Sequence, residues 1–218
     1  MTTKILRMLT LAFLGVMNAA GSSSAAPLPL LQAGDVLLLE LQCYVCRVIG
    51  ASTGSPFNHS GLVITAEGND VRVAQSLTST EMIPLAQFLG QTSSETLLIR
   101  RPLELATLRV QDPAAFAGKA ARLRAYFVQH MQGRAFDSDY LWNNVDEIGR
   151  ELLYCSEMVQ KTLNSVLEQP LPTRPLDFSK AWDFWQRYFH GKPPQGEPGN
   201  SPAALAESNA LETIFSRP

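Results

Sequence analysis

Three cysteines and three histidines are the side chains of this chain that could carry nucleophilic or metal chemistry: Cys43, Cys46, Cys155, His59, His130 and His190. The histidines are scattered. Neither a His-Glu-x-x-His motif nor two Cys-x-x-Cys pairs are present, and these are the spacings that build zinc sites. A glycine-rich phosphate loop and a Gly-x-Ser-x-Gly nucleophile motif are also missing from the sequence. We therefore expect no metal site and set aside the nucleotide-binding and serine-hydrolase interpretations, which leaves cysteine chemistry.

Cys155 follows the short segment 151–154, Glu-Leu-Leu-Tyr, and precedes a stretch, 156–167, with helical periodicity. In the first turn of a helix a cysteine feels the positive end of the helix dipole, which stabilises the thiolate. Backbone N–H groups at the helix start are free to hold the oxyanion of a tetrahedral intermediate. The same position is also typical of a small buried side chain, so position alone leaves both interpretations open.

The elements that must position these residues begin with a short apolar strand at 35–41 and a helix through Cys46 and Ile49. Residues 60–65 and 71–76 are rich in β-branched side chains and flank a Glu-Gly-Asn-Asp turn, which predicts a β-hairpin. Residues 96–100 form a third strand candidate.

The second half of the sequence predicts helices. Asp112 precedes Pro113, which is the pattern of an N-cap followed by a first-turn proline, and apolar residues then recur at helical spacing up to Gly133. A short strand at 151–154, a helix at 156–167 and an aromatic helix at about 181–189 complete the series. The order of elements predicts an α+β fold with an antiparallel sheet packed against helices.

Length and composition suit one globular domain: 218 residues, 45% of them hydrophobic. A net charge of -2 offers no basic surface that would attract a nucleic acid, so we expect no such partner. The sequence leaves the oligomeric state open.

The N-terminus has the three-part pattern of a secretory signal. Lys4 and Arg7 precede the apolar run 8–17, and small residues follow. We expect residues 1–25 to be a signal peptide cleaved after Ala25, which makes the protein periplasmic or extracellular. An uncleaved membrane anchor is the alternative, although the apolar run is short for a bilayer span. We expect one folded domain at 26–190 and a loosely ordered C-terminal tail at 191–218, because proline, glycine and serine dominate 191–202.

Two segments together resemble a known enzyme family. Residues 154–159, Tyr-Cys-Ser-Glu-Met-Val, resemble the nucleophile motif of the NlpC-type papain-like cysteine peptidases, and residues 59–64, His-Ser-Gly-Leu-Val-Ile, resemble their histidine strand. Here the histidine precedes the cysteine, which is the order in the circularly permuted papain-like amidases, the YiiX/YaeF-like group. The resemblance runs from about Gly34 to Leu167 and includes Phe136-Asp137 before the nucleophile segment.

The resemblance implies a circularly permuted papain-like core in which Cys155 attacks an amide carbonyl with His59 as its base, passing through an acyl-enzyme. It implies no cofactor. An acyltransferase or lipid esterase on the same core is an alternative, and a non-catalytic envelope-binding protein is another. The partner is accordingly a small-molecule, peptide or acylated substrate, with an association with the cell wall or with lipid also open. The other histidines, His130 and His190, are expected to be structural or solvated.

The position where the family carries a histidine-orienting glutamate is matched here by Gln75. A glutamine can accept a hydrogen bond from an imidazole N–H, but it cannot stabilise an imidazolium as a carboxylate does. Side chains alternate along a strand, so odd-numbered residues of the two hairpin strands share a face if odd pairs with odd. We then expect the Gln75 oxygen within hydrogen-bond reach of His59.

The cysteine pair of the first helix and the aromatic residues of the last helix each allow two interpretations. Cys43 and Cys46 are three residues apart on the first predicted helix, where a local disulfide is weighed against buried packing and is slightly favoured for an exported chain. The aromatic residues of the last helix either line an acyl-binding surface or pack that helix on the core: Trp182, Phe184, Trp185, Tyr188 and Phe189.

Overall fold

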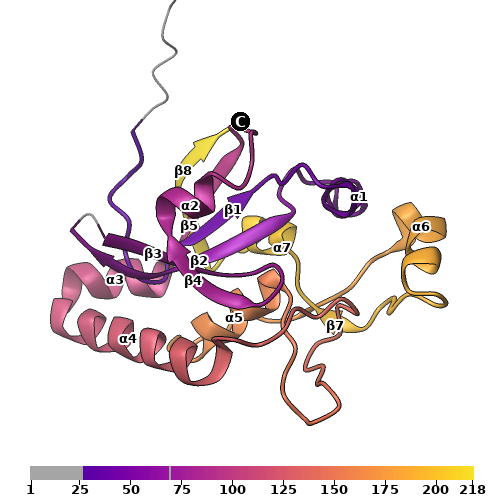
Figure 1. The fold of residues 1–218 in the computed structure, drawn as a ribbon. Coiled ribbons are helices and arrows are strands. Elements are labelled where there is room, and N and C mark those ends of the chain that lie inside the picture. The colour runs from indigo at the N-terminus through magenta and orange to yellow at the C-terminus, as the bar shows by residue number, and fades with distance from the viewer. Residues whose placement is uncertain (1–26, 69) are drawn as a thin grey trace, which may run out of the picture.

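A single antiparallel sheet of six strands, in the order β4-β3-β2-β1-β5-β8, is the centre of the structure, a computed structural model that describes residues 27–68 and 70–218 (Figure 1). The predicted signal peptide and its cleavage site lie outside the described residues. The six strands are β1 (Val36–Leu39), β2 (His59–Glu67), β3 (Asp70–Ser76), β4 (Thr80–Pro84), β5 (Leu97–Pro102) and β8 (Leu211–Arg217). A separate two-stranded pair joins β6 (Arg174–Pro175) to β7 (Pro198–Gly199).

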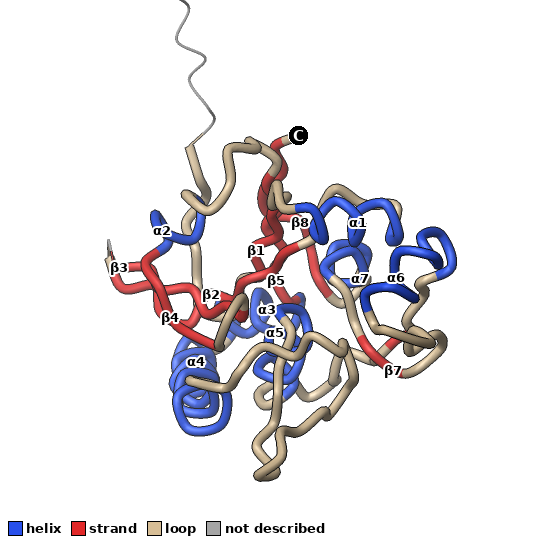
Figure 2. The backbone as a smooth tube through the Cα atoms, turned by 45° about the vertical axis from the view of Figure 1, so that its right-hand side comes forward, coloured by secondary structure: helices blue, strands red, loops and turns tan. Residues whose placement is uncertain are grey.

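Helices cover both faces of the large sheet. They are α1 (Tyr44–Thr53), α2 (Leu85–Leu89), α3 (Leu103–Gln111), α4 (Pro113–Tyr126), α5 (Cys155–Asn164), α6 (Trp182–Tyr188) and α7 (Pro202–Glu207), with a π-helical turn η1 (Phe127–Met131) after α4 and a 3₁₀ turn η2 (Ser179–Ala181) before α6. Figure 2 shows α3, α4 and α5 gathered on one side of the sheet and α2 on the other. The observed fold is therefore α+β, as predicted.

The apolar run of β1 is explained by burial on both faces. Val36 and Leu38 belong to the core beneath α4 and α5, whereas Leu37 and Leu39 belong to the core beneath α2. Because β1 lies in the middle of the sheet with β2 and β5 on either side, it has no solvent face on which polar residues could alternate. The strand predicted at 35–41 is confirmed at 36–39.

The β2–β3 hairpin has the predicted odd-to-odd register, but it reaches it by another route. Glu67 pairs with Asp70, and this pairing alone would set odd-numbered residues opposite even-numbered ones. An irregularity between Val63 and Thr65 inserts one extra residue into β2, and beyond it Val63 pairs with Val73. A β-bulge of this kind moves the register by one residue. The bulge therefore restores the pairing of odd-numbered residues of β2 with odd-numbered residues of β3.

The predicted helices are found with small changes of boundary. Asp112 is the N-cap of α4, where its carboxylate accepts a hydrogen bond of 2.9 Å from the backbone N–H of Ala115. The last predicted turn of that helix is π-helical, η1. The helix predicted to start at Ser156 starts one residue earlier, at Cys155, and the aromatic helix is α6.

The strand predicted at 151–154 is wrong. Those residues form only an isolated bridge between Glu151 and Val145, and they join no sheet. Their backbone groups are bonded elsewhere: Leu153 donates its N–H to the carbonyl of Ala135, and its own carbonyl accepts from the Ser76 hydroxyl. Leu153 and Tyr154 are buried in an extended segment that leads into α5, and such a segment looks like a strand in the sequence.

The prediction of a loose tail at 191–218 is also wrong. β7, α7 and β8 occupy this segment, and β8 pairs with β5 along its length to complete the large sheet. Ala203, Leu205 and Leu211 are buried, and Ser201 caps α7 by accepting from the Ala204 N–H. The domain therefore does not end at residue 190, because the last strand belongs to its central sheet.

Cys43 and Cys46 are joined by a disulfide at the start of α1, in agreement with the favoured interpretation. Cys43 is the N-cap of that helix. Among the described residues, no helix combines the length and the apolar character that crossing a bilayer would take.

Candidate active site

Cys155 is the first residue of α5, so it lies in the first turn of the helix as expected, and it is the free thiol of the chain. Tyr154 before it is extended and provides no side-chain cap, so the first backbone N–H groups of the helix remain available near the sulfur. Cys155 is partly exposed and lines a pocket, while Ser156 and Glu157 after it are buried. The thiol is thus presented at a helix start that faces a cavity.

Burial sets the protonation of this thiol. It raises the pKa of Cys155 above the ordinary value, while the neighbouring Ser60 and the backbone N–H groups at the helix start act in the opposite direction. The sequence-based expectation of a pKa lowered by the helix dipole is therefore not met. Because desolvation disfavours the thiolate more than the dipole favours it, the resting group is a neutral thiol.

His59 opens β2 and is bonded to the residue predicted as its partner. Its Nε2 lies 2.9 Å from Oε1 of Gln75 on β3, and both side chains are buried. Extending the Leu62–Ala74 pairing by one step would set Gln75 opposite Gly61, diagonal to His59. The predicted contact is confirmed.

The pairing of β2 with β3 ends next to the segment that leads to Cys155. The ladder between the described residues of β2 and β3 runs from Glu67–Asp70 to Leu62–Ala74 and stops there. Past that point the lead-in to α5 touches both strands, because the Ser76 hydroxyl donates 2.7 Å to the Leu153 carbonyl and Ser60 lies against Cys155. Ser60 follows His59 directly, so the fold brings Cys155 to the end of β2 that carries the histidine.

The surroundings of His59 keep its imidazole neutral. Burial lowers the pKa of His59 to about 4, and the hydrogen bond to Gln75 opposes this only in part. Its ring lies 5.6 Å from that of Phe88, between centroids. Because an amide oxygen can only accept, the His59 Nε2 must carry the proton and Nδ1 keeps a free lone pair. Nδ1 is therefore the nitrogen that can accept a proton.

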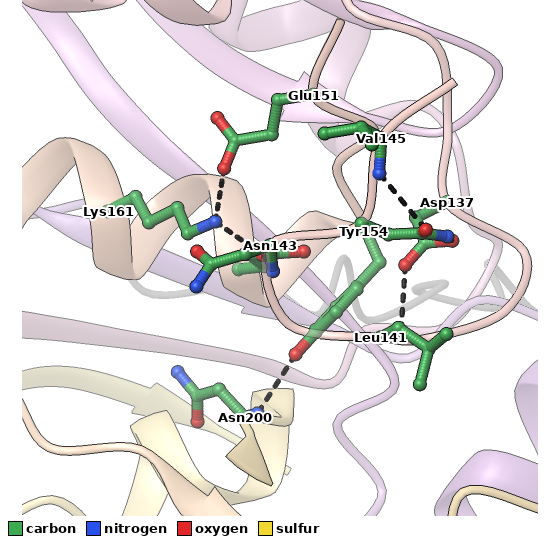
Figure 3. Close-up of polar contacts among 10 residues, drawn as sticks. Asp137, Leu141, Asn143, Val145, Glu151, Tyr154, Lys161 and Asn200 are labelled. Carbon is green, nitrogen blue, oxygen red and sulfur yellow. Dashed lines mark hydrogen bonds and ion pairs between the residues drawn. The ribbon is translucent and has the colours of Figure 1, made fainter. Parts of the chain in front are cut away.

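The segment between η1 and α5 is tied down by two buried carboxylates (Figure 3). Asp137 accepts from the N–H groups of Asp139 and Leu141, at 3.0 and 2.8 Å, and from the amide of Asn144, at 2.8 Å. Burial raises the pKa of Asp137, and these hydrogen bonds oppose the rise. The carboxylate thus replaces regular secondary structure as the partner of the loop backbone.

Glu157 is the second of these carboxylates and lies one turn of helix from Lys161. It accepts 3.0 Å from the N–H of Asn143 and pairs with Lys161 at 2.6 Å. Lys161 also pairs with Glu151 (Figure 3). Burial raises the pKa of Glu157 to about 7, although Lys161 acts to lower it. A helix that carries the candidate nucleophile is in this way clamped to the loop before it.

A pocket of about 270 Å³ opens beside Cys155. Its walls come from α1, the lead-in to α5, the β6–η2 segment, α6 and the start of α7. Apolar side chains dominate the wall: Ile49, Leu176, Phe178, Trp185, Pro202 and Ala203. The charged residues that line it have both signs: Arg174, Asp177, Lys180 and Glu207. Arg174 and Glu207 form an ion pair of 3.2 Å, so the pocket has no strong preference for a charged ligand.

Both interpretations of the aromatic helix apply in part. Trp185 is buried and donates 3.0 Å from Nε1 to the Ser52 hydroxyl of α1, so it packs α6 on the core, yet it also lines the pocket. Phe184 and Tyr188 stack on each other, and each contacts Trp185 edge to face. Tyr140 completes this group, with a φ of 53°, a left-handed conformation that is uncommon for a tyrosine.

Three residues around the candidate site were given no role in the sequence analysis. Ser60 and Tyr140 contribute to the surroundings of Cys155, and Glu81 on β4 accepts 3.0 Å from Nε2 of Gln75. Glu81 could have been found only after β4 had been recognised, since Gln75 and Glu81 are cross-strand partners. His130 and His190 are exposed, as expected for solvated histidines.

Residues 30–215 match the family model described as the permuted papain-like amidase enzyme, YaeF/YiiX, C92 family. The chain belongs to this family. It is accordingly a cysteine hydrolase of the amidase and peptidase kind, and the predicted family resemblance is confirmed. The matched range includes β8, which agrees with the place of that strand in the sheet.

The permuted papain-like amidase is also similar to a solved structure, the crystal structure of metalloprotein YiiX from Escherichia coli O157:H7. The two share 18% identity with a TM-score of 0.70, over 86% of this chain and 98% of that chain, which confirms the fold. The comparison with curated proteins gave no match. In the described part of this amidase, no group of three or more histidine, cysteine or carboxylate side chains is placed to hold a metal ion.

Proposed function

We propose that this permuted papain-like amidase hydrolyses an amide bond through an acyl-enzyme on Cys155, with His59 as the base and Gln75 as the group that orients it. The observation that carries the proposal is the 2.9 Å contact between His59 Nε2 and Gln75 Oε1 at the end of β2 where Cys155 enters. It leaves Nδ1 of a neutral imidazole free for the thiol proton.

The resting pair is neutral, so proton transfer accompanies attack. His59 Nδ1 takes the proton as the sulfur bonds to the carbonyl carbon, and backbone N–H groups at the start of α5 stabilise the resulting oxyanion. The imidazolium then returns that proton to the amine as the carbon–nitrogen bond breaks. Water adds to the thioester by the same route in reverse, which releases the acid and restores the thiol.

The pocket indicates the acyl side of the substrate. Its apolar wall and its balanced charges favour an uncharged apolar acyl or side-chain group over a phosphate or a polycation. An acyltransferase or esterase on the same site remains a second candidate, because the pocket that takes an acyl group does not determine whether water or another acceptor resolves the thioester.

We also propose that the protein is exported. The pattern of residues 1–25 supports this, and so does the Cys43–Cys46 disulfide, since such bonds persist in oxidising compartments. Expression of the full chain with its leader, followed by fractionation and N-terminal sequencing, should find a mature form starting at Ala26 outside the cytoplasm. A full-length protein in the cytoplasmic fraction would contradict export.

The hydrolase proposal is tested with N-acyl p-nitroanilides of increasing acyl length and with short peptide anilides. We expect the wild-type protein to release nitroaniline from apolar acyl derivatives, and Cys155→Ala and His59→Ala to lose this activity with their circular dichroism unchanged. His130→Ala, at an exposed position, is the matched control and should keep it. Activity that survives in Cys155→Ala would contradict the proposal.

A further inference from the structure

The amide of Gln75 is held from two sides. Gln75 and Glu81 are direct cross-strand partners in β3 and β4, and Nε2 of Gln75 donates 3.0 Å to a carboxylate oxygen of Glu81. On its other side Gln75 meets His59. Gln75 is 1% exposed, whereas Glu81 lies toward solvent. Within the described residues, Glu81 forms no ion pair with a lysine, arginine or histidine.

A glutamine beside a histidine has two arrangements of similar energy, because rotating the amide by 180° exchanges its acceptor and its donors. With the oxygen facing the ring, Nε2 of His59 carries the proton and Nδ1 is free. With the NH₂ group facing the ring, Nε2 must accept and the proton moves to Nδ1. In the second arrangement the imidazole has no lone pair on Nδ1 and cannot serve as a base there.

A carboxylate removes this ambiguity. Both oxygens of an ionised glutamate only accept, so the end of the Gln75 amide that faces Glu81 must be the NH₂ end. The oxygen is then turned to His59. The same hydrogen bond places the negative charge of Glu81 beside the NH₂ group of Gln75. This charge polarises the amide, so that the oxygen facing His59 becomes a stronger acceptor.

We propose that Glu81 is a positioning residue that acts through Gln75: it fixes the amide so that its oxygen faces His59, and it thereby selects the imidazole tautomer whose Nδ1 is free. The inference rests on the proposed function, in which that nitrogen takes the proton of Cys155. Gln75 and Glu81 together then orient the imidazole as a single carboxylate beside the histidine would. The negative charge lies on β4 instead of on β3.

The first test reads the tautomer directly. In protein labelled with ¹⁵N-histidine, the His59 signals are identified by their loss in His59→Gln. We expect an Nε2-protonated ring in the wild type and a mixture of both tautomers in Glu81→Gln, because a second amide can meet Gln75 with either end. Glu67→Gln removes one exposed carboxylate from the neighbouring hairpin and is the control. An unchanged tautomer in Glu81→Gln would overturn the proposal.

The second test is a double-mutant cycle on the hydrolysis of p-nitrophenyl acetate. Glu81→Gln should lower kcat about tenfold with little change in KM, which is at the low end of the contribution of a hydrogen bond to a charged group. Gln75→Glu alone sets two carboxylates against each other, so it should also impair turnover. Gln75→Glu combined with Glu81→Gln should restore it, because the carboxylate then lies beside His59 and accepts from the new amide.

Glu81→Gln should therefore lower kcat in the wild-type protein and raise kcat in the Gln75→Glu variant. An equal loss in both would overturn the positioning role and leave only a structural contribution. The two proposals also fail separately. If Cys155→Ala and His59→Ala hydrolyse the ester as fast as the wild type, the proposed function is wrong. If they are inactive while Glu81→Gln matches the wild type in kcat and tautomer, only the role of Glu81 is wrong.

Discussion

The hydroxyl of Ser76 donates a hydrogen bond of 2.7 Å to the carbonyl of Leu153, a residue 77 positions later in the chain. Ser76 follows Gln75 at the end of β3, and Leu153 is two residues before Cys155. This buried bond therefore joins the strand of the orienting residue to the lead-in of the nucleophile. It compensates for the β-ladder that β2 and β3 do not continue at this point.

Removing that hydroxyl should weaken the fold. Ser76→Ala leaves the Leu153 carbonyl buried without this donor, which costs about 1 to 3 kcal/mol of unfolding free energy. Urea denaturation followed by circular dichroism measures the loss. Ser216→Ala, on the exposed side of β8, is the control and should stay within about 0.5 kcal/mol of the wild type. A Ser76→Ala variant as stable as this control would show that the bond contributes nothing.

The thiol of Cys155 should lose its proton at a higher pH in the folded protein than in the unfolded protein. Because burial raises its pKa, the rate of alkylation by iodoacetamide should rise with pH along a curve whose midpoint lies above that of the same thiol in urea. The disulfide protects the other cysteines, so intact mass should show one adduct. A midpoint at or below that of the denatured protein would mean that the helix dipole and His59 outweigh desolvation.

Much of the fold was predictable because periodicity and capping are local signals. The Asp112-Pro113 start of α4 and the buried run of β1 depend on neighbouring residues, and both were found. α3 was missed because the same residue, Asp112, caps its end and the start of α4, so the cap signal marked only the second helix. β8 was missed because its partly exposed face and short length resemble a tail until β5 is known to need a partner.

The candidate site was predictable in part. Cys155 and His59 were assigned through the family resemblance, because the helix start alone left two interpretations of the cysteine open. The His59–Gln75 contact was predicted from strand alternation, and a bulge in β2 provides the register that it needs. Glu81, Tyr140 and Asp137 were not found as partners, because their contacts depend on how separate segments meet. The raised pKa of Cys155 also depends on tertiary burial, which no local pattern reveals.

Gln75→Ala should impair turnover more than binding. Without the amide oxygen the imidazole of His59 loses its partner and its preferred tautomer, while the pocket wall is unchanged, since Gln75 does not line it. We expect kcat for p-nitrophenyl acetate to fall by about tenfold or more and KM to change little. Gln87→Ala in α2 controls for the loss of a glutamine side chain. A higher KM with an unchanged kcat would place Gln75 in substrate binding instead.

Glu157 should make the stability fall as the pH rises. Its pKa in the folded protein is raised to about 7, above its ordinary value near 4.5, so the folded state binds this proton more tightly than the unfolded state does. The folded state is then penalised progressively between pH 4.5 and 7, and fully above pH 7. Glu157→Gln removes this penalty, so its stability relative to the wild type should rise by about 3 kcal/mol from pH 4 to pH 8.

Thermal or urea unfolding at both pH values measures this difference, and Glu147→Gln on the exposed part of the same loop is the control for removing one charge. If the stability difference between Glu157→Gln and the wild type is the same at pH 4 and pH 8, Lys161 has compensated the burial of the carboxylate in full.

The central claim is that the chemistry passes through a covalent acyl group on Cys155. Rapid mixing with a p-nitrophenyl ester of an apolar acid, quenching in acid and intact-mass analysis tests it most directly. We expect the mass of one acyl group on the wild type, mapped by peptide digestion to Cys155, and a longer-lived adduct in Gln75→Ala, where the deacylating base is loosened. Ester hydrolysis without any acyl adduct, or an adduct that persists in Cys155→Ala, would contradict the account.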